Sequence, residues 1–100
     1  MAHIYHITTQ HEWKEEEAKG FYEAPSLHTE GFIHCSEAAQ VAGVLQRYYA
    51  GQSNLVRLTI DTDRLTSKLQ YDHSPSMNEA FPHVYGPINL DAVIDTEIIK

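Results

Sequence analysis

Three histidines of this chain stand in short apolar stretches, where a titrating side chain is unusual. They are His6 in IYHIT, His34 in GFIHCS and His83 in FPHVYGP. Imidazole changes its charge near neutral pH, so it serves as a general acid, a general base or a metal ligand. Of the other four histidines, we expect His3 and His11 to lie at the surface without a role. The three histidines in apolar stretches are therefore the first candidates for a functional site.

His34 is the histidine whose surroundings are most suggestive. It follows the apolar run that starts at Gly31 and precedes a helical pattern, which places it near a helix N-terminus. A helix dipole there disfavours the protonated ring and favours an anionic ligand. Ser36 shares its strand face. His6 shares a face with Thr8, and taken alone it is read most simply as a half-exposed strand histidine.

His83 is held between two prolines and a glycine, in Phe81-Pro82-His83-Val84-Tyr85-Gly86-Pro87. Such a backbone is stiff, which suits the positioning of a side chain beside a ligand but also suits a plain tight bend. Tyr85 should point the same way as His83. Glu79 is the nearest candidate carboxylate, just before the expected strand.

This pattern gives little support to a metal site or to a cysteine hydrolase. Three imidazoles would leave one open position on zinc, but no HxxxH or CxxC spacing supports such a site. We therefore expect no metal. Cys35 is adjacent to His34 and so points to the opposite face of the strand. We expect it to be a small buried apolar residue and not a nucleophile.

The elements that must position these side chains can be read from periodicity and end signals. A helix is predicted from about residue 10 to residue 19, with Thr9 as N-cap, Glu12 completing a capping box and Gly20 ending it. Ser36 should cap a second, amphipathic helix that ends at Gly51. Extended segments are predicted at 3–8, 21–27, 31–36, 55–61, 68–72, 83–86 and 92–99, with a loop at 73–82.

Strands without regular alternation of helices predict an α+β fold. We expect one domain over residues 1–100, with a bent, split, mostly antiparallel sheet around a cleft and two helices in the first half. His6, His34, Ser36, His83 and Tyr85 should converge on that cleft.

Composition limits the partners and the compartment. The formal net charge is −7, and lysine and arginine are scattered singly, which argues against nucleic acid and anionic membranes as partners. One cysteine makes no intrachain disulfide, and the start has no signal-peptide pattern. No apolar run approaches the ~20 residues of a membrane span. We expect a cytoplasmic protein with a small-molecule ligand, and the sequence leaves its oligomeric state open.

The motifs IYHIT, GFIHCS with its following helix, LTID, and FPHVYGPI followed by LDAVI occur in a familiar order. In this the chain resembles the bacterial domain-of-unknown-function family 952 over nearly its whole length. The resemblance implies an ADP-ribosyltransferase-like fold, in which a split antiparallel sheet forms a cleft that holds NAD in relatives.

That resemblance also implies roles for individual residues. Tyr5-His6-Ile7-Thr8 is similar to the first-strand motif whose histidine holds the nicotinamide ribose. Gly31-Phe32-Ile33-His34 looks like the second strand, and the two histidines resemble those of the RNA 2′-phosphotransferase branch. An RNA substrate is nevertheless disfavoured by the charge of −7 and the few arginines.

The late strand of those enzymes carries a glutamate that binds a ribose hydroxyl, and here His83 and Glu79 occupy that region. The implied catalytic set is His6, His34, His83 and Glu79. The implied set for binding NAD or a similar nucleotide is Tyr5, Thr8, Phe32, Ser36 and Tyr85. Three hypotheses follow: an enzyme of the ADP-ribosyl-transfer type, a non-catalytic module that binds a nucleotide-like or anionic ligand, and a metal-dependent enzyme.

Overall fold

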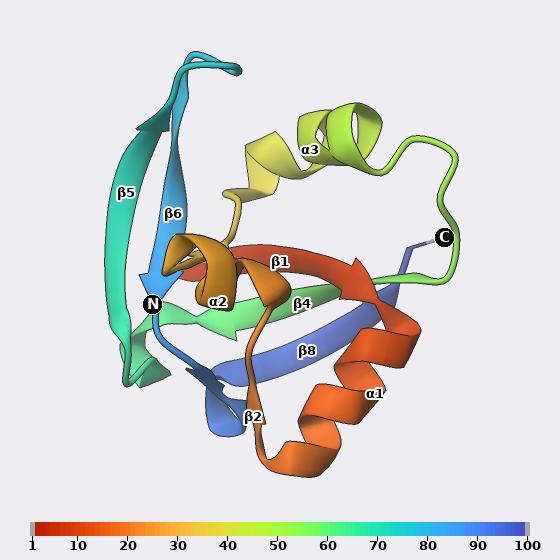
Figure 1. Ribbon diagram of the computed structural model, residues 1–100, viewed down its shortest axis with the longest axis vertical. Coiled ribbons are helices and arrows are strands. Elements are labelled where there is room, and N and C mark those ends of the chain that lie inside the picture. Colours follow the sequence, from red (N-terminus) through yellow and green to blue (C-terminus); the bar gives the residue numbers. More distant parts are fainter. Residues whose placement is uncertain (1, 100) are drawn as a thin grey trace.

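The computed structural model describes residues 2–99, in which antiparallel sheets are flanked by three α-helices (Figure 1). The strands are β1 His3–Thr9, β2 Phe21–Tyr22, β3 Ile33–His34, β4 Leu55–Asp61, β5 Lys68–Ser74, β6 Glu79–Tyr85, β7 Ile88–Asn89 and β8 Val93–Ile98. The α-helices are α1 Gln10–Lys19, α2 Pro25–Glu30 and α3 Val41–Tyr48, with 3-10 turns η1 Ala38–Gln40, η2 Thr62–Arg64 and η3 Leu90–Ala92.

The first sheet has the order β1-β4-β8 and supplies much of the core. β1 and β4 run antiparallel, with Ile4 opposite Ile60 and His6 opposite Leu58. Ile4, Leu58 and Ile60 are fully buried, as the alternation of apolar residues along these strands requires. His6 therefore sits on a strand whose register is fixed by apolar neighbours.

The second sheet has the order β3-β6-β5, and it brings two candidate histidines together. His34 of β3 lies directly opposite His83 of β6. The next pairing is incomplete, because the Cys35 amide donates to the Pro82 carbonyl at 3.0 Å but proline has no N–H to return the bond. This explains why β3 ends at His34, after only two residues.

The chain crosses from one sheet to the other immediately after β3. Ser36 forms an antiparallel bridge with Tyr5, with hydrogen bonds of 2.8 Å and 2.7 Å between their backbone groups. In Figure 1 the β5–β6 pair stands at one side of the β1–β4–β8 sheet, and α3 lies above β1. The bridge therefore joins β1 to the second sheet and sets the distance between their histidines.

Helix α1 begins and ends where its sequence predicts, but its capping differs in detail. The Thr9 side chain accepts a hydrogen bond from the Glu12 amide at 3.1 Å, and Gly20 ends the helix with a φ of 94°. The Glu12 carboxylate does not accept a hydrogen bond from the Thr9 amide, as it would in a capping box. It bonds instead to Thr8 and Tyr22.

Two expectations about the other helices were wrong. Residues from Pro25 were expected to be extended, but they form α2, because proline at the first helical position needs no N–H and has a preset φ. Ala24, just before it, is extended as predicted. The cap of the next helical segment is Glu37 and not Ser36, because Glu37 and Gln40 form the reciprocal capping box there.

The loop expected at 73–82 is also shorter than predicted. β5 continues to Ser74 and β6 begins at Glu79, so Pro82 lies inside a strand and Glu79 lies in β6 rather than before it. The general expectation of antiparallel sheets with few helices is confirmed, with three α-helices in residues 2–99 where two were predicted. None of the helices in this range is long and apolar enough to cross a membrane.

Candidate functional site

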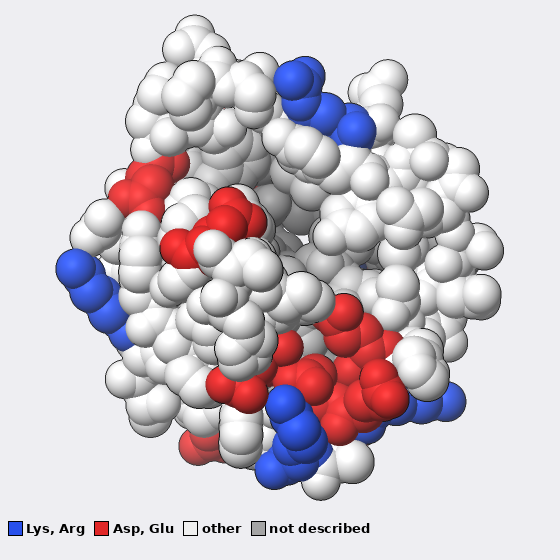
Figure 2. Space-filling model, in the orientation of Figure 1, with Lys and Arg blue, Asp and Glu red and all other residues white. Residues whose placement is uncertain are grey.

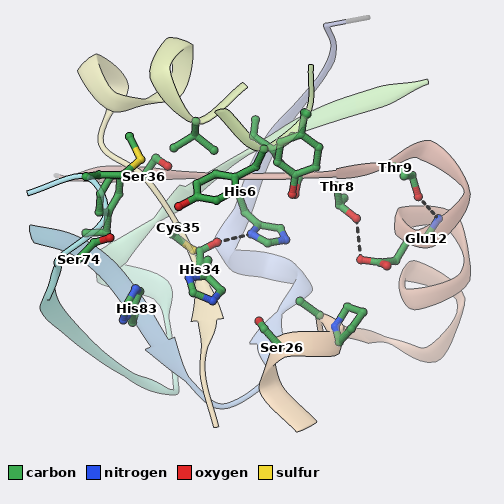
Figure 3. A pocket seen from close by; sticks show the side chains of 18 residues that line it. His6, Thr8, Thr9, Glu12, Ser26, His34, Cys35, Ser36, Ser74 and His83 are labelled. Carbon is green, nitrogen blue, oxygen red and sulfur yellow. Dashed lines mark hydrogen bonds between the residues drawn. The ribbon is translucent and has the colours of Figure 1, made fainter. Parts of the chain in front are cut away.

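A pocket of about 570 Å³ opens between the two sheets, α3 and the start of α2 (Figure 3). β1, β3 and β6 each contribute a histidine to its wall: His6, His34 and His83. The remaining lining residues are Ile7, Thr8, Thr9, Glu12, Ala24, Pro25, Ser26, Cys35, Ser36, Val44, Tyr48, Tyr49, Ser74, Met77 and Phe81. The wall thus combines apolar and aromatic surface with a few polar groups, as small-molecule sites do.

Charge is unevenly distributed around this pocket. Within residues 2–99 no lysine or arginine lines it, and Glu12 is its one acidic lining residue. Figure 2 shows a central hollow bordered mostly by uncharged residues, with acidic side chains gathered below it, in the region of α1. A ligand with several negative charges therefore finds no cationic side chain among these lining residues.

His6 is buried, and both of its ring nitrogens are occupied. Nδ1 lies 2.5 Å from the carbonyl oxygen of His34, and Nε2 lies 2.7 Å from the Tyr22 hydroxyl. A carbonyl only accepts, so Nδ1 must carry a hydrogen and donate it. Burial lowers the pKa of His6 to about 4, because the charged ring would lose its hydration.

Tyr22 and Glu12 extend this network along the wall. The Tyr22 hydroxyl also lies 2.9 Å from Glu12 Oε1, and the Thr8 hydroxyl donates to the same oxygen at 2.7 Å. Tyr22 is fully buried, and burial raises the pKa of its hydroxyl well above the usual range. A chain of polar contacts therefore runs from the His34 backbone through His6 and Tyr22 to Glu12.

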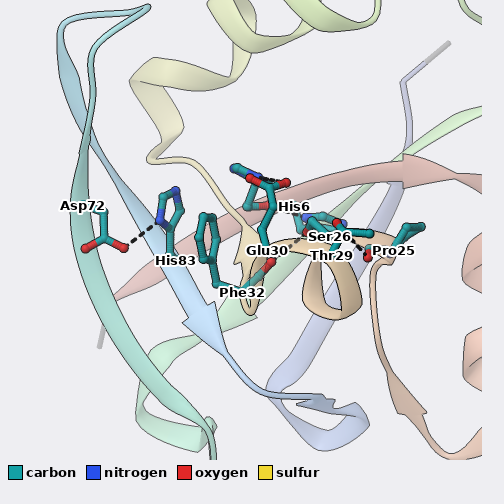
Figure 4. Close-up of polar contacts among 9 residues, drawn as sticks. His6, Pro25, Ser26, Thr29, Glu30, Phe32, Asp72 and His83 are labelled. Carbon is teal, nitrogen blue, oxygen red and sulfur yellow. Dashed lines mark hydrogen bonds and ion pairs between the residues drawn. The ribbon is translucent and has the colours of Figure 1, made fainter.

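His83 forms a different arrangement, with a carboxylate on one nitrogen (Figure 4). Its Nδ1 lies 2.8 Å from Asp72 Oδ2, and the Tyr85 hydroxyl donates to the same oxygen. Hydrogen bonds from Gln70, Tyr85 and His83, in that order of effect, lower the pKa of Asp72 to about 2. Asp72 is therefore ionised at neutral pH and holds the proton of His83 on Nδ1.

Aromatic rings fix the two neighbouring histidines. The Phe32 ring stacks on His83, with centroids 4.1 Å apart and planes 13° apart. The same Phe32 ring meets His34 edge-on at 4.9 Å, and the His34 and His83 rings are 5.1 Å apart. His34 is half exposed, and its Nε2 lies 3.1 Å from Glu30 Oε2.

The predicted site residues divide into those that line the pocket and those outside it. His6, Thr8, His34, Ser36 and His83 line it. Tyr5, Phe32, Glu79 and Tyr85 do not.

The four residues outside the pocket have other partners. The Arg57 guanidinium lies over the Tyr5 ring, on the other face of β1, 5.2 Å from its centroid. Phe32 and Tyr85 pack behind His83, against its ring and against Asp72 respectively. Glu79 is exposed at the start of β6 and accepts a hydrogen bond from Gln40 at 3.2 Å.

Cys35 is 3% exposed, in agreement with the expectation of a small buried residue. Burial raises the pKa of its thiol well above the ordinary value, so the reactive thiolate is disfavoured. Within residues 2–99, no group of three or more His, Cys, Asp or Glu side chains is arranged to hold a metal ion.

Glu12, Tyr22 and Asp72, which form the hydrogen-bond networks of His6 and His83, were not among the predicted site residues. Glu12 occupies a capping-box position, which gave its carboxylate a different expected partner. Tyr22 belongs to a two-residue strand with no periodicity to read. The contact between Asp72 and His83 follows from the register of β5 against β6. The sequence does not fix that register, because the residues between and after these strands are loop-like.

This architecture defines a class of small α+β proteins with antiparallel sheets and few helices. Residues 7–96 match the family described as "Protein of unknown function (DUF952)", and the chain belongs to that family. No curated protein sequence matches the chain.

Solved structures of protein CC0527 from Caulobacter crescentus are similar to this chain. Its X-ray crystal structure is 30% identical with a TM-score of 0.86, over 96% of this chain and 84% of that one. Its solution NMR structure is 30% identical with a TM-score of 0.84, over 100% of this chain and 86% of that one.

Proposed function

We propose that the pocket binds a nucleotide-like small molecule and that His83 acts in it as a general base, in an enzyme of the ADP-ribosyl-transfer type. One observation carries the proposal. Asp72 holds the Nδ1 hydrogen of His83, and Phe32 fixes the ring, so that Nε2 is left without a hydrogen-bond partner among residues 2–99. His83 lines the pocket. A carboxylate-oriented imidazole with one unengaged nitrogen is the arrangement that proton abstraction uses.

The reaction would proceed as follows. The bond between nicotinamide and the ribose carbon breaks, nicotinamide leaves with the bonding electron pair, and the sugar becomes cation-like. An acceptor hydroxyl then bonds to that carbon, and its proton passes to His83 Nε2. Holding the reactants in place supplies much of the rate, which is why a ring fixed by both Phe32 and Asp72 supports this role.

NAD is the first ligand to test. The pocket volume of about 570 Å³ lies within the range of small-molecule sites. Imidazole and tyrosine rings offer surface for stacking against a flat base. The division of the sheet into β1-β4-β8 and β3-β6-β5 on two sides of the pocket supports the proposal of an ADP-ribosyltransferase-like fold.

His6 enters this proposal in an altered form. The resemblance implied that it holds a ribose hydroxyl, but both of its nitrogens already bond within the protein. We therefore assign it the positioning of His34, whose carbonyl oxygen accepts its Nδ1–H. It would touch a ribose only by giving up one of these bonds.

A nicotinamide-release assay with NAD tests the proposal. Wild type should release nicotinamide in the presence of acceptor alcohols, and His83→Gln should lose most of this activity, on the order of 100-fold for a general base. His73→Gln, at an exposed histidine of β5, is the matched control and should retain it. Equal rates in the His83 and His73 variants would contradict the role of His83.

A non-catalytic binding module is the second candidate, and one observation favours it. Lysine and arginine are absent from the pocket lining within residues 2–99, so the pyrophosphate of NAD lacks its usual cationic partners. Calorimetry separates the two functions. Heat of NAD binding without nicotinamide release identifies a binding module. If neither binding heat nor nicotinamide release is detected, NAD is excluded as the ligand.

A further inference from the structure

The polar network around Tyr22 contains more hydrogen-bond contacts than there are hydrogens to donate when His6 and Tyr22 are neutral and Glu12 is ionised. Four contacts are involved: His6 Nδ1 to the His34 carbonyl at 2.5 Å, His6 Nε2 to Tyr22 at 2.7 Å, Tyr22 to Glu12 at 2.9 Å, and Thr8 to Glu12 at 2.7 Å. Each needs one hydrogen. A neutral His6, a neutral Tyr22 and the Thr8 hydroxyl supply only three, and an ionised Glu12 supplies none.

The hydrogen is missing from one of the two contacts that the Tyr22 hydroxyl makes. Nδ1 of His6 must donate to a carbonyl, so in a neutral ring Nε2 has only a lone pair. The single Tyr22 hydrogen can then reach either Nε2 or Glu12, and the other contact would set two lone pairs against each other at 2.7 or 2.9 Å. Such an unsatisfied contact costs free energy at the buried His6–Tyr22 pair and, to a smaller extent, at the part-buried Tyr22–Glu12 pair, whereas one more proton satisfies both contacts.

We infer that His6, Tyr22 and Glu12 share one additional proton, so that the pair of His6 and Glu12 has no net charge. Two arrangements satisfy all four contacts. In one, a protonated Glu12 donates to Tyr22, and Tyr22 donates to a neutral His6. In the other, a cationic His6 donates to Tyr22, and Tyr22 donates to an ionised Glu12.

Burial favours the first arrangement. The ring of His6 is enclosed, and its lowered pKa of about 4 opposes the cation. The titratable groups facing the ring are Tyr22 from β2, Glu12 from α1 and His34 from β3. Tyr49, just after α3, donates to the Ile7 carbonyl and belongs to the same wall. None of these neighbours is a lysine or arginine that could balance an ionised Glu12 beside a neutral His6.

The consequence concerns the ligand and rests on the proposed function. A pocket whose one acidic lining residue is neutralised does not repel a phosphate-bearing ligand, even though no lysine or arginine lines it within residues 2–99. The wall also holds a proton beside the ligand. Above the pH at which the network loses this proton, affinity for an anionic ligand should fall.

The test uses the ligand-free protein, so its outcome is independent of whether NAD binds. Nitrogen NMR of ¹⁵N-histidine-labelled protein at pH 7 reports which His6 nitrogens carry hydrogen. Infrared difference spectra of wild type against Glu12→Gln report a protonated carboxyl, with Glu15→Gln, at an exposed position of α1, as the control.

Two results support the inference: a doubly protonated His6, or a His6 protonated only at Nδ1 together with a carboxylic-acid band that Glu12→Gln removes and Glu15→Gln keeps. A His6 protonated only at Nδ1 without that band overturns it, as does a ring protonated only at Nε2. If Glu12→Gln fails to fold, Tyr22→Phe replaces it, because loss of the bridging hydroxyl should also remove the band.

Discussion

At the scale of residues, the three histidines of one pocket have three different chemical states. His6 is buried and hydrogen-bonded at both ring nitrogens, His34 is half exposed beside Glu30, and His83 is hydrogen-bonded to Asp72. Their spacing in the sequence gives no hint of this difference. Only the neighbours supplied by other elements decide which ring can exchange a proton with a ligand.

The shared proton predicts an unusual pH dependence of stability in Glu12→Gln. A glutamine can donate to Tyr22 without a proton from solvent, so His6 then titrates alone, and burial keeps its pKa in the folded variant below the unfolded value of 6.5. Between the folded and the unfolded pKa the unfolded state binds more protons, so the stability of this variant should rise with pH.

In wild type this rise should be smaller, because the folded network keeps its proton across that range. Chemical denaturation of wild type, Glu12→Gln and the control Glu15→Gln between pH 4 and pH 7 measures it. An equally steep rise in all three proteins would show that Glu12 is ionised and that no proton is shared.

Cys35 should be inert in the folded protein. Burial raises the pKa of its thiol, and the side chain is 3% exposed, so alkylation needs unfolding to expose it. Alkylation by iodoacetamide at pH 8 should therefore be far slower in buffer than in denaturant, by at least 100-fold, since it follows the unfolded population. Equal rates in the two conditions would be incompatible with a buried thiol.

At the scale of elements, the sequence predicted those with local signals and missed those set by distant partners. α1 has its Thr9 cap and its Gly20 end, and β4 has its alternating apolar residues, so both lie where expected. β3 is shorter than predicted because Pro82, almost fifty residues later in the chain, has no backbone N–H to donate to it. No signal within residues 31–36 reports that.

The N-cap of α1 should contribute measurably to stability, because α1 carries Glu12 to the pocket. Thr9→Ala removes the bond from the Thr9 hydroxyl to the Glu12 amide and should lower the free energy of unfolding by about 1 kcal/mol. Thr29→Ala, at an exposed position whose hydroxyl makes a long 3.5 Å contact, is the control and should change it little. Equal effects of the two substitutions would contradict the capping role.

Gly86 and Gly43 should respond in opposite ways to alanine. A Cβ at Gly86 would lie 2.5 Å from Ser67 Oγ, which donates to the Pro87 carbonyl at 2.6 Å, so Gly86→Ala should destabilise by about 1–3 kcal/mol. A Cβ at Gly43 in α3 meets only Met77 at 3.8 Å, so Gly43→Ala should stabilise by up to about 1 kcal/mol. Denaturation midpoints measure both, and a stabilising Gly86→Ala would contradict the close packing there.

At the scale of the whole molecule, the family and the general fold followed from ordered motifs, whereas the site followed only in part. GFIHCS and FPHVYGP pointed to the right strands, and the register then placed His34 opposite His83. Asp72, which bonds to His83, and Tyr22 and Glu12, which continue the network of His6, come from segments whose local patterns indicated a strand, an extended stretch and a helix cap. Pairing between strands and the approach of a helix to a sheet depend on the complete core, which no local pattern specifies.

An NMR titration of wild type with NAD, following the ring signals of all seven histidines, tests directly whether this pocket binds a nucleotide. We expect shifts for His34 and His83, which line the pocket, and none for the exposed His3, His11 and His73. Shifts confined to those exposed histidines, or no shift at any NAD concentration, would contradict the assignment of this pocket as a nucleotide site.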